Sequence, residues 1–181
     1  MALAATLAVT VTQASPRAGA DDADPLDQLV DAAAQRLLTA DPAAAVKWQT
    51  KGNIEDPPRV DRVLAAVTAD ANAHGVDPAY VTTIFTDQID ATEAIEHSRF
   101  AQWKLDPGGV PTSAPDLSAS RSTIDALNRQ MVDQIASNWD LLHSPACAAA
   151  LQDAKNAATA SRRLDALYQQ ALAFATRSYC P

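Results

Sequence analysis

Four basic residues that are far apart in the sequence could together bind an anion: Arg36, Lys47, Arg59 and Arg121. Lys47 follows Arg36 by about three helical turns, so a roughly continuous helix would place both on one face. Arg121 lies in the first turns of an expected helix, where backbone N–H groups already favour negative charge. Gathered in one pocket, these groups would bind carboxylates. Each of them taken alone also fits an ordinary solvated position.

Lys47 has an unusual setting among these four residues. In the stretch AAAVKWQTKGNIEDPPRV, it follows three alanines and a valine and precedes Trp48. An ammonium group is costly to bury unless it is paired. Lys47 therefore either lies along the surface with its charge in solvent or is held inside as part of a site. We expect Lys51, beside Gly52, to be in solvent.

A second polar group occurs in the stretch ATEAIEHSRF, residues 91–100. Thr92 and Glu96 are four residues apart and share a helix face, with Gln88 one turn earlier. Ile89 and Ile95 flank them, which indicates a polar pocket inside a helical bundle. A surface stripe, or Glu96 as an ion-pair partner, would give the same pattern.

Other kinds of catalytic site find little support in the sequence. Glu93, Glu96 and His97 resemble part of a carboxylate metal site, but a bundle metal site needs ligands from several helices and no second Glu-x-x-His motif is present. We therefore predict no metal. The chain has no Gly-rich phosphate loop and no persuasive Ser-His-Asp or Cys-His arrangement. Asp56 is sufficiently explained as a helix cap. A site of this composition would work by binding and electrostatics.

The composition and the N-terminus limit the class of protein. The chain has 181 residues and a net charge of −8, which argues against nucleic acid as the main partner.

Residues 2–11 are small and apolar, and Ala18-Gly19-Ala20 fits a signal-peptide cleavage site, although a basic start is missing. We expect a leader over residues 1–20 and a single domain over 21–181, secreted or periplasmic, with no membrane association after leader removal. A disordered alanine-rich leader is the alternative.

The chain contains two cysteines, Cys147 and Cys180. An even pair on an exported chain predicts a disulfide, and it would contribute about 3–4 kcal/mol in the loop-entropy model. Two buried free thiols are the alternative if the chain is not exported.

Helical periodicity and the scarcity of glycine predict one all-α domain of about six helices. The clearest linker is DPGGVPTSAPD, residues 106–116. Proline following aspartate marks several expected helix starts. The expected helices cover about 26–52, with a restart or kink at Asp41-Pro42, then 56–75, 77–106 and 118–142, a segment from 144, and a last one that includes 164–174.

The ordered set of polar residues resembles the all-helical chorismate mutases. The set is Arg36, Lys47, Asp56-x-x-Arg59 and Thr92-x-x-x-Glu96. Arg121 within DLSASRS and the cysteine pair resemble the exported gamma group of that family, as do DAAAQRL, VKWQTKGNIEDPPRV, DQIDATEAIEHSRFAQWKL and SPACAAAL. The similarity extends from about Leu26 to Cys180. It implies a type II helical bundle that rearranges chorismate to prephenate, in the phenylalanine and tyrosine branch of aromatic amino acid biosynthesis, without a cofactor.

The resemblance also implies a role for each polar residue. Arg36 and Arg121 resemble the anchors of the two substrate carboxylates, and Thr92 resembles a hydrogen-bond partner on the carboxylate side. Lys47 resembles the donor that reaches both the ether oxygen and a carboxylate. Glu96 resembles the second ether-oxygen donor, for which it must be protonated, and burial would raise its pKa accordingly.

Other implied features concern the opposite pocket wall and the assembly. Arg59, with Asp56 nearby, resembles the wall near the ring hydroxyl. One turn later, some relatives place Gln or Glu facing the substrate, where this chain has Val63. The resemblance further implies a homodimer in which each chain builds its own pocket.

Two other functions remain compatible with the sequence. One is a non-catalytic exported helical protein that binds an anionic metabolite or a protein partner, with no need for Lys47 and Glu96 to converge. The other is a degenerate mutase, inactive because of Val63.

Overall fold

The computed structural model describes residues 24–113 and 116–181. All regular elements in these ranges are helical, which confirms the all-α prediction. The predicted leader and its cleavage site at Ala20 lie outside the described residues. The helices are α1 (Asp27–Leu38), α2 (Ala40–Thr50), α3 (Pro57–His74), α4 (Pro78–Leu105), the 3-10 turn η1 (Pro107–Gly109), α5 (Leu117–Ser137), α6 (Trp139–Leu142), α7 (Cys147–Arg162) and α8 (Ala166–Ala175).

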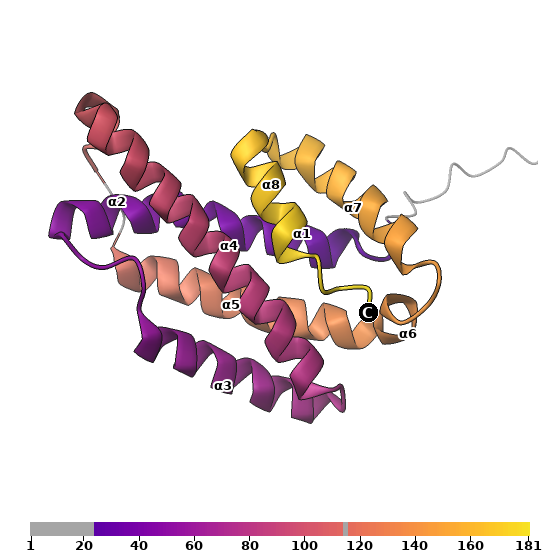
Figure 1. The fold of residues 1–181 in the computed structure, drawn as a ribbon. Helices are drawn as coiled ribbons and strands as arrows, with labels where there is room; N and C mark the ends of the chain where they lie inside the picture. The colour runs from indigo at the N-terminus through magenta and orange to yellow at the C-terminus, as the bar shows by residue number, and fades with distance from the viewer. Residues whose placement is uncertain (1–23, 114–115) are drawn as a thin grey trace, which may run out of the picture.

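The difference from the expected six helices comes from two short interruptions. The first expected helix divides at Thr39, whose hydroxyl donates to the Arg36 carbonyl at 2.7 Å. Pro42 has no N–H for the Leu38 carbonyl, so the regular ladder is broken there. In Figure 1, α2 nevertheless continues roughly along α1. The other interruption, at Asn138, separates α5 from the single turn of α6.

Two helices begin at an Asp-Pro sequence, as predicted. Asp56 accepts a hydrogen bond from the Arg59 N–H at 3.2 Å and caps α3. Asp77 accepts from the Ala79 N–H at 2.9 Å and caps α4. An aspartate cap satisfies a free N–H of the first turn, and a proline there loses no helical hydrogen bond. The α3 cap matters for function because it fixes the position of Arg59.

Helix α4 is the central element of the bundle. It crosses the other helices diagonally in Figure 1, with α3 on one side and α8 on the other, and it also packs on α2. Helix α1 packs on α5 and α7. A continuous apolar core between these helices includes the fully buried Phe85, Met131 and Ile135. Residues on α1, α2, α3, α4 and α5 can therefore meet at one place.

A separate aromatic cluster lies where α2 packs on the second half of α4. The rings of Trp48 and Phe100 are 5.1 Å apart, and those of Trp48 and Trp103 are 5.7 Å apart, in edge-to-face arrangements. Arg99 of α4 pairs with Asp41 of α2 at 2.6 Å. Together these contacts hold α2, and with it Lys47, against α4.

The C-terminus is fixed to the bundle. Cys147 and Cys180 form a disulfide with Cα atoms 5.7 Å apart, joining α7 to the residue before the last. Among the described helices, none is long and apolar enough to cross a membrane.

Candidate active site

Arg36 is buried at the centre of the bundle, although it carries a charge. Only 4% of the residue is exposed. Its Nε donates to Asn128 Oδ1 at 2.9 Å, and its Nη1 donates to Gln88 O and to Thr92 Oγ1, each at 3.2 Å. Burial lowers the Arg36 pKa to about 10, so the guanidinium remains protonated at neutral pH. Within the described residues, Nη2 has no partner and is free for a ligand.

Lys47 is partly buried on the cavity wall, with 18% of its side chain exposed. Its Nζ donates to Glu96 Oε2 at 2.6 Å and to the Ile54 carbonyl at 2.7 Å. Two of the three ammonium hydrogens are therefore committed, and the third is available to a ligand. Lys51, four residues later, is exposed. The expected exposure of Lys51 is thus confirmed, and of the two alternatives for Lys47 the structure shows the one in which its ammonium group is paired within a site.

Glu96 is a carboxyl group in a nearly solvent-free position. Its side chain is 4% exposed. Burial raises the Glu96 pKa, and the hydrogen bond from Lys47 opposes this shift without cancelling it. Because Lys47 occupies Oε2, Oε1 is the oxygen on which Glu96 can carry a proton toward a ligand.

Arg59 and Arg121 lie on the other side of the site. The Arg59 Nη2 donates to Asp125 Oδ1 at 2.5 Å, and this pair links α3 to α5. The Arg121 Nη2 donates to Asp56 Oδ2 at 3.0 Å, and 45% of the Arg121 side chain is exposed. Asp56 thus caps α3 and also holds Arg121 at the rim.

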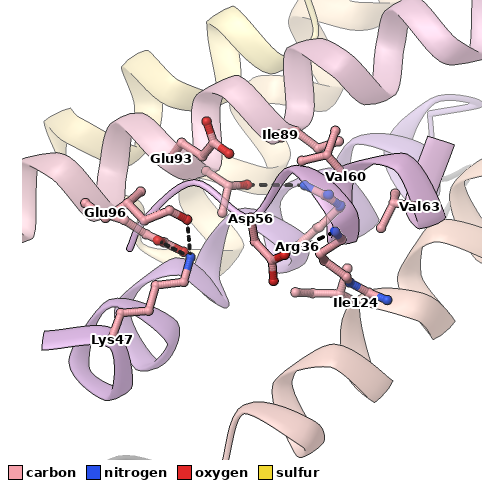
Figure 2. A pocket seen from close by; sticks show the side chains of 12 residues that line it. Arg36, Lys47, Asp56, Val60, Val63, Ile89, Glu93, Glu96 and Ile124 are labelled. Carbon is pink, nitrogen blue, oxygen red and sulfur yellow. Dashed lines mark hydrogen bonds and ion pairs between the residues drawn. The ribbon is translucent and has the colours of Figure 1, made fainter. Parts of the chain in front are cut away.

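Arg36, Lys47, Glu96 and Arg59 line one cavity, shown in Figure 2, that contains about 480 Å³ of free space including its open mouth. Of the predicted site residues, Arg121 is not among those that line it. Lys47 and Glu96 point toward one another at one end, and Val60, Val63, Ile89 and Ile124 lie at the other. The lining residues are Arg36, Lys47, Ile54, Asp56, Arg59, Val60, Val63, Ile89, Thr92, Glu93, Glu96 and Ile124.

Val63 contributes to the apolar end of this cavity. It is 4% exposed and lies in the cavity wall with Val60, Ile89 and Ile124. These four side chains carry no hydrogen-bonding group. A polar substituent placed against them would lose its hydrogen bonds to water without replacement.

Three contributors to the site had no role in the sequence prediction, and a fourth, Glu93, was considered there only as part of a metal site. Asn128 and Asp125 orient Arg36 and Arg59 from α5, the Ile54 carbonyl accepts from Lys47, and Glu93 lines the cavity. Burial raises the Glu93 pKa, and the charges of Glu55 and Asp90 add to the effect. Residues 125 and 128 lie one turn apart on the helix that carries Arg121, which is the signal that could have indicated them.

The described residues contain no group of three or more His, Cys, Asp or Glu side chains close enough to hold a metal ion. His97 pairs with Glu55 at 2.8 Å. It does not line the cavity with Glu93 and Glu96.

Comparison with known proteins places the chain in a family. The family described as Chorismate mutase type II matches residues 17–97. A secreted chorismate mutase of Mycolicibacterium smegmatis is 56% identical over 174 residues, which cover 96% of each chain. The chain belongs to the chorismate mutase type II family. The family resemblance of the sequence is thus confirmed.

Two further chorismate mutases are similar to this chain, one in sequence and one in both sequence and structure. The secreted chorismate mutase of Mycobacterium tuberculosis is 56% identical over 165 residues, covering 91% of this chain and 83% of its own. The crystal structure of a chorismate mutase from Burkholderia thailandensis superimposes with a TM-score of 0.82 at 34% identity, covering 87% of this chain and 100% of its own. The chorismate mutase similarity therefore spans nearly the whole described fold.

Proposed function

We propose that this protein is an exported chorismate mutase that rearranges chorismate to prephenate in the cavity between α1, α2, α3 and α4. One observation carries this proposal: Lys47 and Glu96 converge, 2.6 Å apart, in a cavity that Arg36 and Arg59 also line, in a chain of the chorismate mutase type II family. The reaction is an intramolecular [3,3] shift, which needs neither an enzyme nucleophile nor a cofactor. The residues of the cavity have only to bind, orient and stabilise charge.

The first task is to bind a substrate with two carboxylates. Arg36 anchors one of them through its free Nη2, and Thr92 assists on the same side. The network around Arg36 fixes the plane of its guanidinium, so the free Nη2 is held in place to donate to a carboxylate. Holding the flexible substrate in a chair-like conformer removes much of the entropic part of the barrier.

The second task is to stabilise the negative charge that develops on the ether oxygen as its C–O bond breaks. The free hydrogen of Lys47 and a proton on Glu96 Oε1 supply two donors to that oxygen. Because Ile54 and α4 already hold Lys47 in place, little reorganisation is needed during the reaction. Preorganised donors of this kind provide a large share of many enzymatic rate enhancements.

Arg121 has to change partner to act as the second carboxylate anchor. Its present partner, Asp56, is a cavity residue, so the guanidinium lies at the mouth and close to an entering anion. A substrate carboxylate would compete with Asp56 for this arginine. Arg59, oriented by Asp125, completes the wall near the ring hydroxyl.

The first test is an absorbance assay for the disappearance of chorismate with the purified protein, and identification of prephenate as the product. We expect turnover far above the uncatalysed rate. No turnover above buffer would exclude both the enzymatic function and the proposed roles of the cavity residues.

The apolar wall around Val63 predicts that one substitution should increase the affinity for the substrate. Val63→Gln introduces a hydrogen-bonding group at the position where some relatives carry one, and we expect KM to fall about two- to tenfold with kcat nearly unchanged. Val63→Leu is the matched control, because it adds bulk without a polar group. An equal KM in Val63→Gln and the parent protein would contradict a role of this wall in hydroxyl recognition.

The family relation also supports proposals on the export and the assembly of the protein. We infer that residues 1–20 form a leader and that residues 21–181 are the mature domain, consistent with two secreted relatives. We also infer a homodimer in which each chain builds its own cavity, since α1 to α5 of one chain supply all the residues named. Light scattering on the purified protein measures the assembly.

A further inference from the structure

The charge of Arg36 is balanced differently from that of the other three basic side chains of the site. Each of those three contacts a carboxyl group of this chain: Lys47 with Glu96 at 2.6 Å, Arg59 with Asp125 at 2.5 Å, and Arg121 with Asp56 at 3.0 Å. Arg36 is the only one of the four that is fully enclosed, yet none of the ion pairs among residues 24–113 and 116–181 involves it. A buried charge without a counter-charge is costly, so Arg36 requires a partner from outside the chain.

Neutral oxygen atoms surround the Arg36 guanidinium in place of a carboxylate. Its Nε donates to Asn128 Oδ1 at 2.9 Å. Its Nη1 donates to the Gln88 carbonyl and to Thr92 Oγ1, each at 3.2 Å, and to Gln88 Oε1 at 3.5 Å. These acceptors satisfy the N–H groups and fix their direction without cancelling the charge. The whole positive charge therefore remains available at the cavity that Arg36 lines.

Asn128 is the member of this neutral set that a carboxylate could replace with the least change in shape. It is 5% exposed, and it reaches Arg36 from α5. Asp125, one turn earlier on the same helix, is such a carboxylate and pairs with Arg59. This ion pair supplies little net counter-charge to Arg36, because Arg59 lowers the Arg36 pKa while Asp125 raises it. Helix α5 thus presents an aspartate to one arginine of the site and an asparagine to the other.

We propose that Asn128 is a positioning residue that also sets the affinity for the substrate: its neutral Oδ1 orients the Arg36 guanidinium and leaves the positive charge for a ligand carboxylate. Asn128 is not among the residues that line the cavity, and it acts only through Arg36. The proposal rests on the proposed function of the cavity. It explains why the most deeply buried cation of the site has only uncharged partners within the described part of the chain.

Asn128→Asp tests the proposal, because aspartate has nearly the same shape and keeps an oxygen acceptor for the Arg36 Nε. The change adds a negative charge, and the adjacent guanidinium favours the ionised form of the new carboxyl group. This charge competes with the substrate carboxylate for Arg36 and repels it. We expect KM for chorismate to rise about thirtyfold or more while kcat changes less than about threefold, because the lost interaction is common to the ground and transition states. Initial rates and the thermal midpoint, measured at neutral and at mildly alkaline pH, test this.

A purely structural role of Asn128 predicts a different result for the same variant. The retained acceptor would then preserve KM, and only the thermal midpoint would change. A parental KM in Asn128→Asp at both pH values would overturn the proposal. Failure of this variant to fold would also overturn it, because the new charge would then not be accepted by Arg36.

The matched control for the added charge is Gln130→Glu. Gln130 lies on the same helix two residues further along and is exposed. The substitution also converts an amide to a carboxylate, so both variants change the net charge equally. We expect the KM of Gln130→Glu to equal that of the parent protein. An equal rise in KM for both variants would show a general effect of net charge and would overturn the proposal.

Asn128→Leu separates the orienting hydrogen bond from the neutrality of the side chain. Leucine is uncharged but accepts no hydrogen bond, so the buried Arg36 Nε loses its acceptor. We expect a lower thermal midpoint and a rise in KM of about three- to tenfold, smaller than that of Asn128→Asp. A larger rise in Asn128→Leu than in Asn128→Asp would show that neutrality does not set the affinity and would overturn the proposal.

The parent protein distinguishes the failure of this proposal from that of the proposed function. If the parent protein turns chorismate over and Asn128→Asp has the parental KM, only the role of Asn128 fails. A parent protein without turnover overturns the proposed function and this proposal together.

Discussion

Lys47→Ala is expected to lower kcat/KM for chorismate by about a thousandfold or more. The substitution removes a preorganised donor to the ether oxygen, and the loss of one such donor in other enzymes costs about a hundred- to a thousandfold. It also leaves Glu96 without its partner at 2.6 Å, in a position where burial already raises the carboxyl pKa. Initial rates over a range of chorismate concentrations, with the thermal midpoint measured in parallel, test this expectation.

Lys51→Ala is the matched control for this variant. Lys51 lies four residues further along the chain, is exposed, and has a left-handed backbone with φ of 54°. Alanine has a Cβ, as lysine does, so the substitution adds no backbone strain there. We expect parental kinetics. Full activity in a folded Lys47→Ala protein would rule out the assigned mechanism, although the enzyme class would stand.

Glu96→Gln is expected to flatten the fall in activity at alkaline pH. In the parent protein only protonated Glu96 donates to the ether oxygen, so kcat should drop up to tenfold for each pH unit above its raised pKa. A glutamine amide donates at every pH in this range. The variant should therefore lose activity at low pH, where the acid is the better donor, and exceed the parent protein at high pH. A pH profile of kcat for both proteins measures the effect.

Glu93→Gln distinguishes Glu96 from the other cavity carboxyl group with a raised pKa. The Glu93 charge contributes to the upward shift of the Glu96 pKa, so removing it should move the alkaline fall to slightly lower pH without abolishing it. A profile that flattens in Glu93→Gln and persists in Glu96→Gln would show that Glu93, and not Glu96, carries the titration.

Much of the helical layout could be predicted from local sequence. The starts of α3 and α4 follow from Asp56 and Asp77 before proline, and the end of α3 follows from Gly75, whose φ is 71°. Helix caps and prolines affect only the first or last turn of a helix, so their effect can be predicted without knowledge of tertiary contacts. The restart expected at Asp41-Pro42 occurs two residues earlier, at Thr39. The break at Asn138 was not expected, because it interrupts the helix only locally while the apolar periodicity continues through it.

The site could be predicted less completely from local sequence patterns. The basic and acidic residue types indicated an anion pocket, but which of these side chains come together depends on how α1, α2 and α4 cross. The pairing of Arg36 with Asn128 spans 92 residues, and no spacing rule predicts it. Arg121 illustrates the same limit: its place near a helix start favoured anion binding, whereas the contact with Asp56 depends on how α3 packs against α5.

The aromatic cluster beside the cavity gives the protein an internal optical reporter. Trp48 directly follows Lys47, and it packs edge-to-face on Phe100 and Trp103. Trp139, the third tryptophan, contacts Tyr80 in a different part of the bundle. A ligand that binds Lys47 changes the surroundings of Trp48, the next residue. Tryptophan fluorescence emission can therefore report occupancy of the cavity without turnover, and the emission of Trp139 serves as an internal reference.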